Sequence, residues 1–250
     1  MKRLNIFVDE TGEFGFEEGK SELYGVSFTF HEQDDDITNE LNKLNNKLDK
    51  LQYTNMIHMA DLIMRRGDYK NFDIKLRKSI FNSIYQFSRR ISVKYCSIII
   101  DKRYVNIRTQ LRQKLAFEIN KLIKEHINYF NKFDYIVMYY DNGQETLGII
   151  LDSIFSQFDN FEHRIDFDHK EKRLFQVSDM LTFIDKYDYK YKHKLSFTNG
   201  EKYFFTKEDI RRILKELNKK RFWTLKKQPL RLLFQAALGA NTGLILFTDQ

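Results

Sequence analysis

The sequence contains very little proline, cysteine or glycine. Its 250 residues include one Pro, one Cys and ten Gly. Disordered segments and flexible linkers are usually rich in Pro and Gly, so we expect a continuous, compactly folded chain. A single cysteine excludes both a disulfide framework and a thiolate zinc site. Cys96 lies in an apolar run, which favours a buried core thiol over a nucleophile.

Long apolar runs are also missing. No run approaches the length of a membrane span. After Lys2 and Arg3 only residues 4–8 are apolar, which is too short for the apolar region of a signal peptide. We therefore expect a cytoplasmic protein without membrane association. The sequence has no glycine-rich phosphate loop, HExxH zinc pair or GxSxG elbow, so nothing favours a kinase, a metalloprotease or a serine hydrolase.

Hydrophobic residues make up 42% of the chain, with 23 Phe and 14 Tyr, which is enough to build a large core. Helical and strand-like patterns alternate. The predicted strands cover residues 4–8, 22–30, 93–100, 133–140 and 164–167, and the predicted helices cover 37–51, 72–88, 111–130, 147–158, 174–187 and 207–222. This order predicts an α/β fold with a mixed sheet flanked by helices. Residues 223–250 show no firm period, and we expect them to be an extension packing on the same domain.

Carboxylates directly follow three of the predicted strands. Asp9 and Glu10 follow the first, and Asp101 and Asp141 follow two later ones. Each Asp alone is more often a turn former or a helix cap. Open α/β sheets, however, hold their functional groups at strand ends. The recurrence of carboxylates at such ends therefore indicates a candidate site.

Asp179 lies on the apolar face of a predicted helix, between Phe175 and Phe183, four residues to either side. An ionised carboxylate there costs several kcal/mol unless it is paired or bound to a metal. Two interpretations stand side by side. Asp179 is either a metal ligand or a core Asp satisfied by backbone donors or an Arg.

Two further groups combine imidazole and carboxylate. His58 has apolar neighbours, which is typical of a core histidine with satisfied hydrogen bonds. Alternatively, Asp61 three residues later orients it for proton transfer or metal binding. Asp168 stands with Asp166 and His169 directly before the helix that carries Asp179.

Phosphodiester hydrolysis would use such carboxylates. The reaction needs charge neutralisation on the transferring phosphoryl group and an activated water. Two Mg²⁺ or Mn²⁺ ions held by shared carboxylates supply both, and these metals prefer hard oxygen ligands. Three or four acidic groups from separate strands and one helix are the minimum for that cage.

Several short motifs resemble a known family, the proteins catalogued as domain of unknown function 3800. That family's pattern is an Asp-Glu-Ser-Gly opening, a Glu-Ile-His segment, a mid-chain strand ending in Asp, and a Gln-x-Ala-Asp helix. The corresponding segments are residues 7–12 (FVDETG), 57–58 (IH), 139–141 (YYD) and 175–180 (FQVSDM). They occur in the family's order within residues 4–222, most of the chain.

The resemblance implies a ribonuclease H-like domain over residues 1–222. It assigns Asp9, Asp141 and Asp179 as metal ligands, and Glu10 as a further ligand or a group that positions them.

The chain departs from the family pattern at two positions. Thr11 replaces a Ser and keeps the hydroxyl, whereas Met56 replaces a Glu and removes a carboxylate. A four-carboxylate cage would then need Asp168 or Asp101 as a substitute.

The basic charge is concentrated near the C-terminal end. Residues 202–231 hold eleven Lys or Arg and three acidic residues, a net of +8, whereas the whole chain carries +7. Such a segment suits a phosphate backbone, although a solvated helix face explains it equally well. Arg211, Lys215 and Lys219 should share one helix face. Phe222 and Trp223 beyond it could stack a base.

We therefore expect an Mg²⁺- or Mn²⁺-dependent nuclease with nucleic acid, DNA or RNA, as its partner. Asp9, Asp141 and Asp179 would hold the metals, Glu10 or Asp168 would complete the set, and His58 would assist proton transfer. The alternative is a non-catalytic nucleic-acid or protein-binding module of the same fold, such as a component of a phage or antiphage system. The Met56 departure favours that alternative.

Overall fold

A five-stranded mixed sheet forms the centre of the protein. The computed structural model describes residues 1–16, 21–105, 107–166 and 169–222. The strands lie in the order β3-β2-β1-β4-β5. β1 pairs antiparallel with β2 and parallel with β4, β2 pairs antiparallel with β3, and β4 pairs parallel with β5. Their bounds are β1 (Arg3–Thr11), β2 (Leu23–Glu32), β3 (Lys94–Asp101), β4 (Tyr135–Tyr139) and β5 (Phe161–Arg164).

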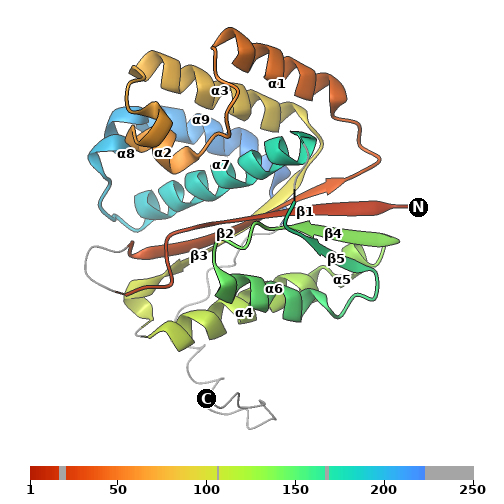
Figure 1. Ribbon diagram of the computed structural model, residues 1–250. Coiled ribbons are helices and arrows are strands. Elements are labelled where there is room, and N and C mark those ends of the chain that lie inside the picture. Colours follow the sequence, from red (N-terminus) through yellow and green to blue (C-terminus); the bar gives the residue numbers. More distant parts are fainter. Residues whose placement is uncertain (17–20, 106, 167–168, 223–250) are drawn as a thin grey trace.

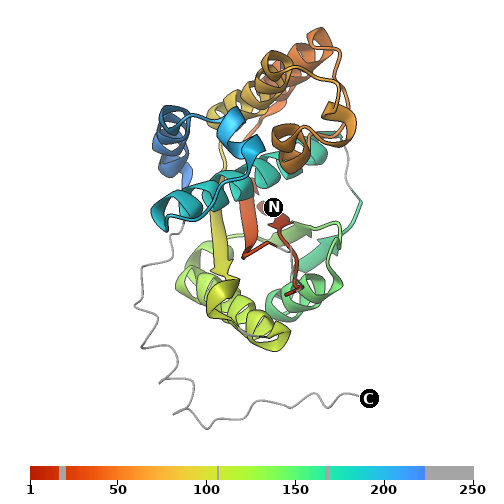
Figure 2. The same ribbon diagram turned by 90° about the vertical axis from the view of Figure 1, so that its left-hand side faces the viewer.

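Helices cover both faces of the sheet (Figures 1 and 2). One face carries what we call the α7 layer: α1 (Thr38–Lys50), α2 (Met59–Met64), α3 (Ile74–Arg90), α7 (His169–Lys192), α8 (Asn199–Phe204) and α9 (Lys207–Leu217). The other face carries the α4 layer: α4 (Arg108–Glu125), α5 (Ile127–Phe130) and α6 (Glu145–Phe155). Short 3₁₀ turns are η1 (Gly67–Tyr69), η2 (Lys102–Tyr104) and η3 (Asn218–Lys220).

The alternation of side chains along β1 divides the core in two. Ile6 and Val8 pack with the α4 layer, whereas Phe7 packs with the α7 layer. Since successive side chains of a strand point to opposite faces, Asp9 continues toward the α7 layer and Glu10 toward the α4 layer. The two carboxylates therefore leave β1 on opposite sides of the sheet.

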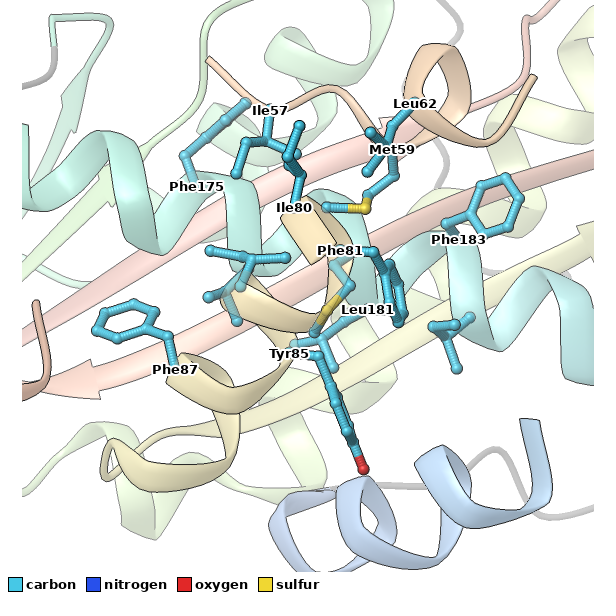
Figure 3. Packing of buried hydrophobic residues seen from close by; sticks show 14 of the residues in the cluster. Ile57, Met59, Leu62, Ile80, Phe81, Tyr85, Phe87, Phe175, Leu181 and Phe183 are labelled. Atoms are coloured by element: carbon cyan, nitrogen blue, oxygen red, sulfur yellow. The ribbon is translucent and has the colours of Figure 1, made fainter. Parts of the chain in front are cut away.

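The core under the α7 layer is built from large apolar side chains of α2, α3 and α7 (Figure 3). Met59 of α2, Phe81 of α3 and Leu181 of α7 are all buried there. Each such side chain contributes about 1.5–3 kcal/mol when buried. This packing fixes the short helix α2 against α7, which matters for the site below.

The predicted α/β fold class is confirmed, since the structure is a mixed sheet flanked by helices. The ribonuclease H-like assignment stays a prediction. Cys96 is buried in β3 as expected, and burial raises the pKa of its thiol. In the part of the chain that the structure describes, no helix is long and apolar enough to span a membrane.

Several element bounds predicted from the sequence were wrong. The helix over 111–130 is interrupted at His126, where α4 ends and the separate turn α5 begins. The last strand is residues 161–164 instead of 164–167, because Phe161 rather than a later residue pairs with Ile136. The helix over 147–158 ends at Phe155. The short helices α2 and α8 were not predicted, since six residues carry too little periodicity. Residues 223–250 lie outside the described residues.

Candidate functional site

Helix α7 is hydrogen-bonded to the central strands at Ser178. The Ser178 hydroxyl donates to the Phe7 carbonyl of β1 at 3.0 Å. Ser27 of β2 donates to the Ser178 carbonyl at 2.9 Å, and the Thr182 hydroxyl donates to Ser27. Ser27 is registered directly opposite Asp9. These buried bonds fix the segment that carries Asp179 beside Asp9.

The first predicted strand ended too early: β1 continues to Thr11, so Asp9 and Glu10 lie within it, whereas Asp141 follows its parallel neighbour β4. The last registered pair of β1 and β4 is Phe7 with Tyr139, so each Asp lies two residues beyond that pair in the same direction. Asp9 is partly buried and Asp141 is exposed. The pairing of β1 with β4 brings the two positions to the same end of the sheet.

Glu10 and Asp141 meet at Gly143. A Cβ at position 143 would lie 2.8 Å from Glu10 Oε1 and 3.3 Å from Asp141 Oδ1, so only glycine leaves room for both carboxylates. The Gly143 amide donates to Asp141 Oδ1 at 3.0 Å. The other oxygen of Glu10, Oε2, is buried and accepts no hydrogen bond from the described residues. We call Asp9, Glu10, Asp141 and Asp179 the carboxylate cluster.

The members of the carboxylate cluster repel one another. Burial raises the pKa of Asp9 well above its ordinary value, and the charges of Asp179, Glu10 and Asp141 raise it further. Burial and then Asp141 raise the pKa of Glu10 to about 7. Burial raises the pKa of Asp179 to about 6. Among the described residues no Lys or Arg forms an ion pair with any of the four. In the described residues, the cluster therefore gathers carboxylates with no Lys or Arg to offset their charge.

Asp179 also holds the start of α2. The Met59 amide donates to Asp179 Oδ2 at 2.8 Å, and this bond lowers the pKa of Asp179 against the effect of burial. A core Asp179 was expected to be satisfied by backbone donors or by an Arg. The backbone donor is present, and in the described part of the chain no Arg pairs with Asp179. His58 precedes Met59, and its charge also lowers the pKa of Asp179. His58 is exposed, so the expectation of a core histidine was wrong.

Asp101 does not substitute for the missing carboxylate. Arg103 donates to both of its oxygens, at 2.9 and 2.6 Å, and Tyr189 donates at 3.3 Å. Burial acts to raise the pKa of Asp101, but the hydrogen bonds from Arg103 outweigh it and lower that pKa. Asp168 lies outside the described residues. Met56 is close to α7, since Gln176 Nε2 lies 3.0 Å from its sulfur.

Asp61, which was expected only to orient His58, has a second role in the structure. It lies on α2, and its negative charge raises the pKa of Asp179. Asp61 therefore extends the acidic surroundings of Asp179. The signal in the sequence was its spacing from His58, but its proximity to Asp179 depends on how α2 packs on α7.

The donor chemistry of the carboxylate cluster fits Mg²⁺ or Mn²⁺. All four side chains offer hard oxygen donors, and the unpartnered Oε2 of Glu10 is available to a cation. In the described residues, however, no three His, Cys, Asp or Glu side chains stand close enough together to hold an ion as they are. A bound cation would have to draw the carboxylates closer.

The basic residues of α9 lie on its outer face. Ile210, Ile213 and Leu217 are buried, whereas Arg211, Lys215 and Lys219 are exposed. A single helix face was predicted for the last three, but the helix ends at Leu217 and Lys219 falls in η3. Lys219 also forms an ion pair with Glu216 at 3.0 Å.

The residues after α9 are less available to nucleic acid than predicted. Arg221 forms an ion pair with the buried Asp185 at 2.6 Å. The Phe222 ring packs against Phe30 and Tyr129, with ring centroids 5.3 and 4.7 Å apart, so its proposed stacking on a base was wrong. Trp223 lies outside the described residues.

Comparisons with known proteins add little. No family model matches the chain, and no curated protein matches it. The fold is similar to a chain in the structure of the PCNA:RNase HII complex from Archaeoglobus fulgidus, with 14% sequence identity, a TM-score of 0.39, and coverage of 91% of this chain and 98% of that chain. A similarity at this level carries no functional argument, so function is inferred from the site.

Proposed function

We propose that this protein is a divalent-metal-dependent phosphodiester hydrolase, a nuclease, whose site is the carboxylate cluster. The observation that carries the proposal is the convergence of four acidic side chains from β1, the turn after β4, and α7, with no Lys or Arg paired to them in the described residues. Partly buried carboxylates without a counterion destabilise the fold. A divalent cation would remove that cost.

The residues have distinct places in such a site. Asp9, Asp141 and Asp179 would hold the metal, which neutralises charge on the phosphoryl group and activates water when bound. Glu10 approaches from the other face of the sheet, and with a pKa of about 7 it exchanges protons at neutral pH. His58, exposed and near Asp179, would assist proton transfer.

Membership of the domain of unknown function 3800 family is part of the same proposal. It is supported by Asp9, whose pKa is raised by the charges of both Asp141 and Asp179, the two other residues of the resemblance. Nucleic acid is the proposed substrate because the exposed basic face of α9 belongs to the same molecule.

A second candidate is a binding module that has the fold without catalysis. One observation favours it: Met56 occupies the position beside α7 where the family pattern has Glu, and Asp101 is already paired with Arg103. The cluster then lacks one carboxylate. Metal binding and cleavage, measured separately, distinguish the two candidates.

The test compares wild type with Asp9→Asn and with the exposed control Asp159→Asn. We expect wild type and Asp159→Asn to bind Mn²⁺ in calorimetry and to cleave labelled DNA or RNA only when Mg²⁺ or Mn²⁺ is present. Asp9→Asn should lose both properties. Equal Mn²⁺ binding by wild type and Asp9→Asn would refute the site, whereas binding without cleavage would favour the binding module.

A further inference from the structure

Lys186 lies on the same side of the sheet as Asp9 and Asp179. Its Nζ is 3.4 Å from Thr11 Oγ1. Thr11 is two residues beyond Asp9, so both side chains leave β1 on the face of α7. Lys186 is about two helical turns beyond Asp179.

The spacing of the contacts shows that α7 runs alongside β1. Ser178 bonds to Phe7 and Lys186 to Thr11. Eight helical residues span roughly 12 Å and four strand residues roughly 13 Å, so α7 and β1 advance by nearly equal lengths between the two contacts. Gly25 of β2 makes this approach possible, since a Cβ there would lie 2.9 Å from the Thr11 methyl and 3.4 Å from that of Thr182.

Among the described residues, no carboxylate forms an ion pair with Lys186, whereas the nearby Lys190 has such a partner. Lys190 forms an ion pair with Glu201 at 2.8 Å, and Lys102 donates to the carbonyls of Glu13 and Gly15 at 3.0 and 2.6 Å. In the described part of the chain, the Lys186 ammonium donates a hydrogen bond to the Thr11 hydroxyl, which is neutral.

The surroundings of Lys186 disfavour its positive charge. Burial lowers its pKa to about 8, and the charges of Lys190 and Lys102 lower it further, whereas Glu201 acts in the opposite direction. A lysine kept only to pack its stem would lie in less costly surroundings, since an exposed ammonium carries no desolvation cost. The Lys186 ammonium thus lies near those of Lys190 and Lys102, and in the described residues it forms no ion pair; this arrangement suits a bound anion.

We infer that Lys186, together with the Thr11 hydroxyl, binds a phosphate of the substrate backbone beside the carboxylate cluster. The substrate class rests on the proposed function. The phosphate contact itself needs no metal, because an ammonium attracts a phosphodiester directly. It would place the backbone along α7 so that the neighbouring phosphodiester reaches Asp9 and Asp179.

The experiment measures anisotropy of labelled single-stranded DNA, single-stranded RNA and duplex DNA in the presence of a chelator, over a series of salt concentrations. The proteins are wild type, Lys186→Gln, Lys186→Arg and the control Lys124→Gln, an exposed residue of α4 in the opposite layer. Lys186→Gln should weaken binding roughly tenfold. It should also lower the slope of log affinity against log salt by about 0.7–0.9. Lys186→Arg should retain most of the affinity, and Lys124→Gln should behave as wild type.

Thermal melting separates this role from a structural one. Lys186→Gln should melt at or above the wild-type temperature, because it removes a partly buried charge without an ionic partner. A lower melting temperature together with unchanged affinity would assign Lys186 to the fold alone. Equal affinity and slope in wild type and Lys186→Gln, or no binding of any of the three probes by wild type, would overturn the inference.

The outcome is distinguishable from a failure of the proposed function. If binding depends on Lys186 but wild type cleaves nothing with Mn²⁺, the phosphate contact stands and the nuclease proposal fails. If wild type cleaves and Lys186→Gln leaves both KM and affinity unchanged, the nuclease stands and the phosphate contact fails.

Discussion

Glu10 differs from the other members of the carboxylate cluster in the face of the sheet from which it comes. Asp9 and Asp179 meet on the side of the α7 layer, whereas Glu10 lies near Tyr24 of β2 and Tyr140 after β4, which pack with the α4 layer. Its buried Oε2 accepts no hydrogen bond from the described residues, and the Tyr24 hydroxyl is likewise buried without a partner there. Burying the ionised form of Glu10 thus costs more free energy than burying its protonated form. A cation nearby would favour the ionised form and release the proton.

This environment predicts that the metal-free protein loses stability as pH rises. The pKa of Glu10 is about 7 in the folded state against 4.5 ordinarily, and that of Asp179 is about 6 against 3.8. Between about pH 4 and 7 the folded protein binds protons that the unfolded chain has already released. The contribution of these carboxyl groups to the free energy of unfolding is therefore complete below about pH 4 and is lost as the pH rises through 6 to 7. For Glu10 we expect about 1–3 kcal/mol between pH 5 and 7.5.

Melting curves with a chelator across this pH range measure the effect. Glu10→Gln should flatten the decline, because its amide does not titrate, while Asp159→Asn should leave it unchanged. Mn²⁺ at pH 7.5 should restore stability to wild type. A wild-type melting temperature that rises steadily from pH 5 to 7.5 in chelator would contradict the raised pKa values.

At the scale of elements, one hydrogen bond joins α2 to α7. Asp179 Oδ2 accepts the amide of Met59, the first residue of α2, although the two are 120 positions apart. The first amides of a helix have no partner within the helix, so a carboxylate there acts as a cap. Asp179 therefore has a structural contact in addition to its proposed role in metal binding.

Two substitutions at Asp179 separate these roles. Asp179→Asn keeps an oxygen that accepts the Met59 amide and removes the charge, so the metal-free melting temperature should equal or exceed that of wild type while metal binding and cleavage are lost. Asp179→Ala removes the acceptor as well and should cost about 0.5–2 kcal/mol. If Asp179→Asn destabilises the protein as much as Asp179→Ala does, the charge itself supports the fold and the catalytic assignment is weakened.

Residues of the site were predictable from the sequence only where the residues next to them in the chain form a recognisable pattern. Strand patterns ending in Asp9 and Asp141 were recognisable, because an apolar run followed by a carboxylate is a local signal. The proximity of Asp61 to Asp179 was not, since it depends on a six-residue helix packed against a distant one. Phe222 was assigned to nucleic acid for a similar reason. Its helical period continued past Leu217, but the Phe222 amide donates to the Tyr95 carbonyl of β3 at 2.7 Å and draws the chain into the core.

At the scale of the whole molecule, the acidic and basic groups occupy different places. The carboxylate cluster lies where β1 and β4 end, whereas the basic residues of α9 lie on the outer face of the α7 layer. A nucleic acid bound to both would have to extend across that layer. The net charge of +7 favours its approach in general, but the exposed face of α9 would decide where it lies.

Replacing Arg211, Lys215 and Lys219 together with Gln tests that face. If each contacts one phosphate, the slope of log affinity against log salt should fall by about two to three. We expect the lower end, because Lys219 is already paired with Glu216. Exposed helix charges contribute little to stability, so the melting temperature should change little.

The matched control replaces Lys43, Lys47 and Lys50 of α1, an exposed row in the same layer, with Gln. A fall in slope for the α9 variant alone assigns backbone binding to α9. Equal falls in both would mean that only net charge matters, and no fall in either would leave α9 a solvated face, with Lys186 as the remaining candidate for phosphate binding.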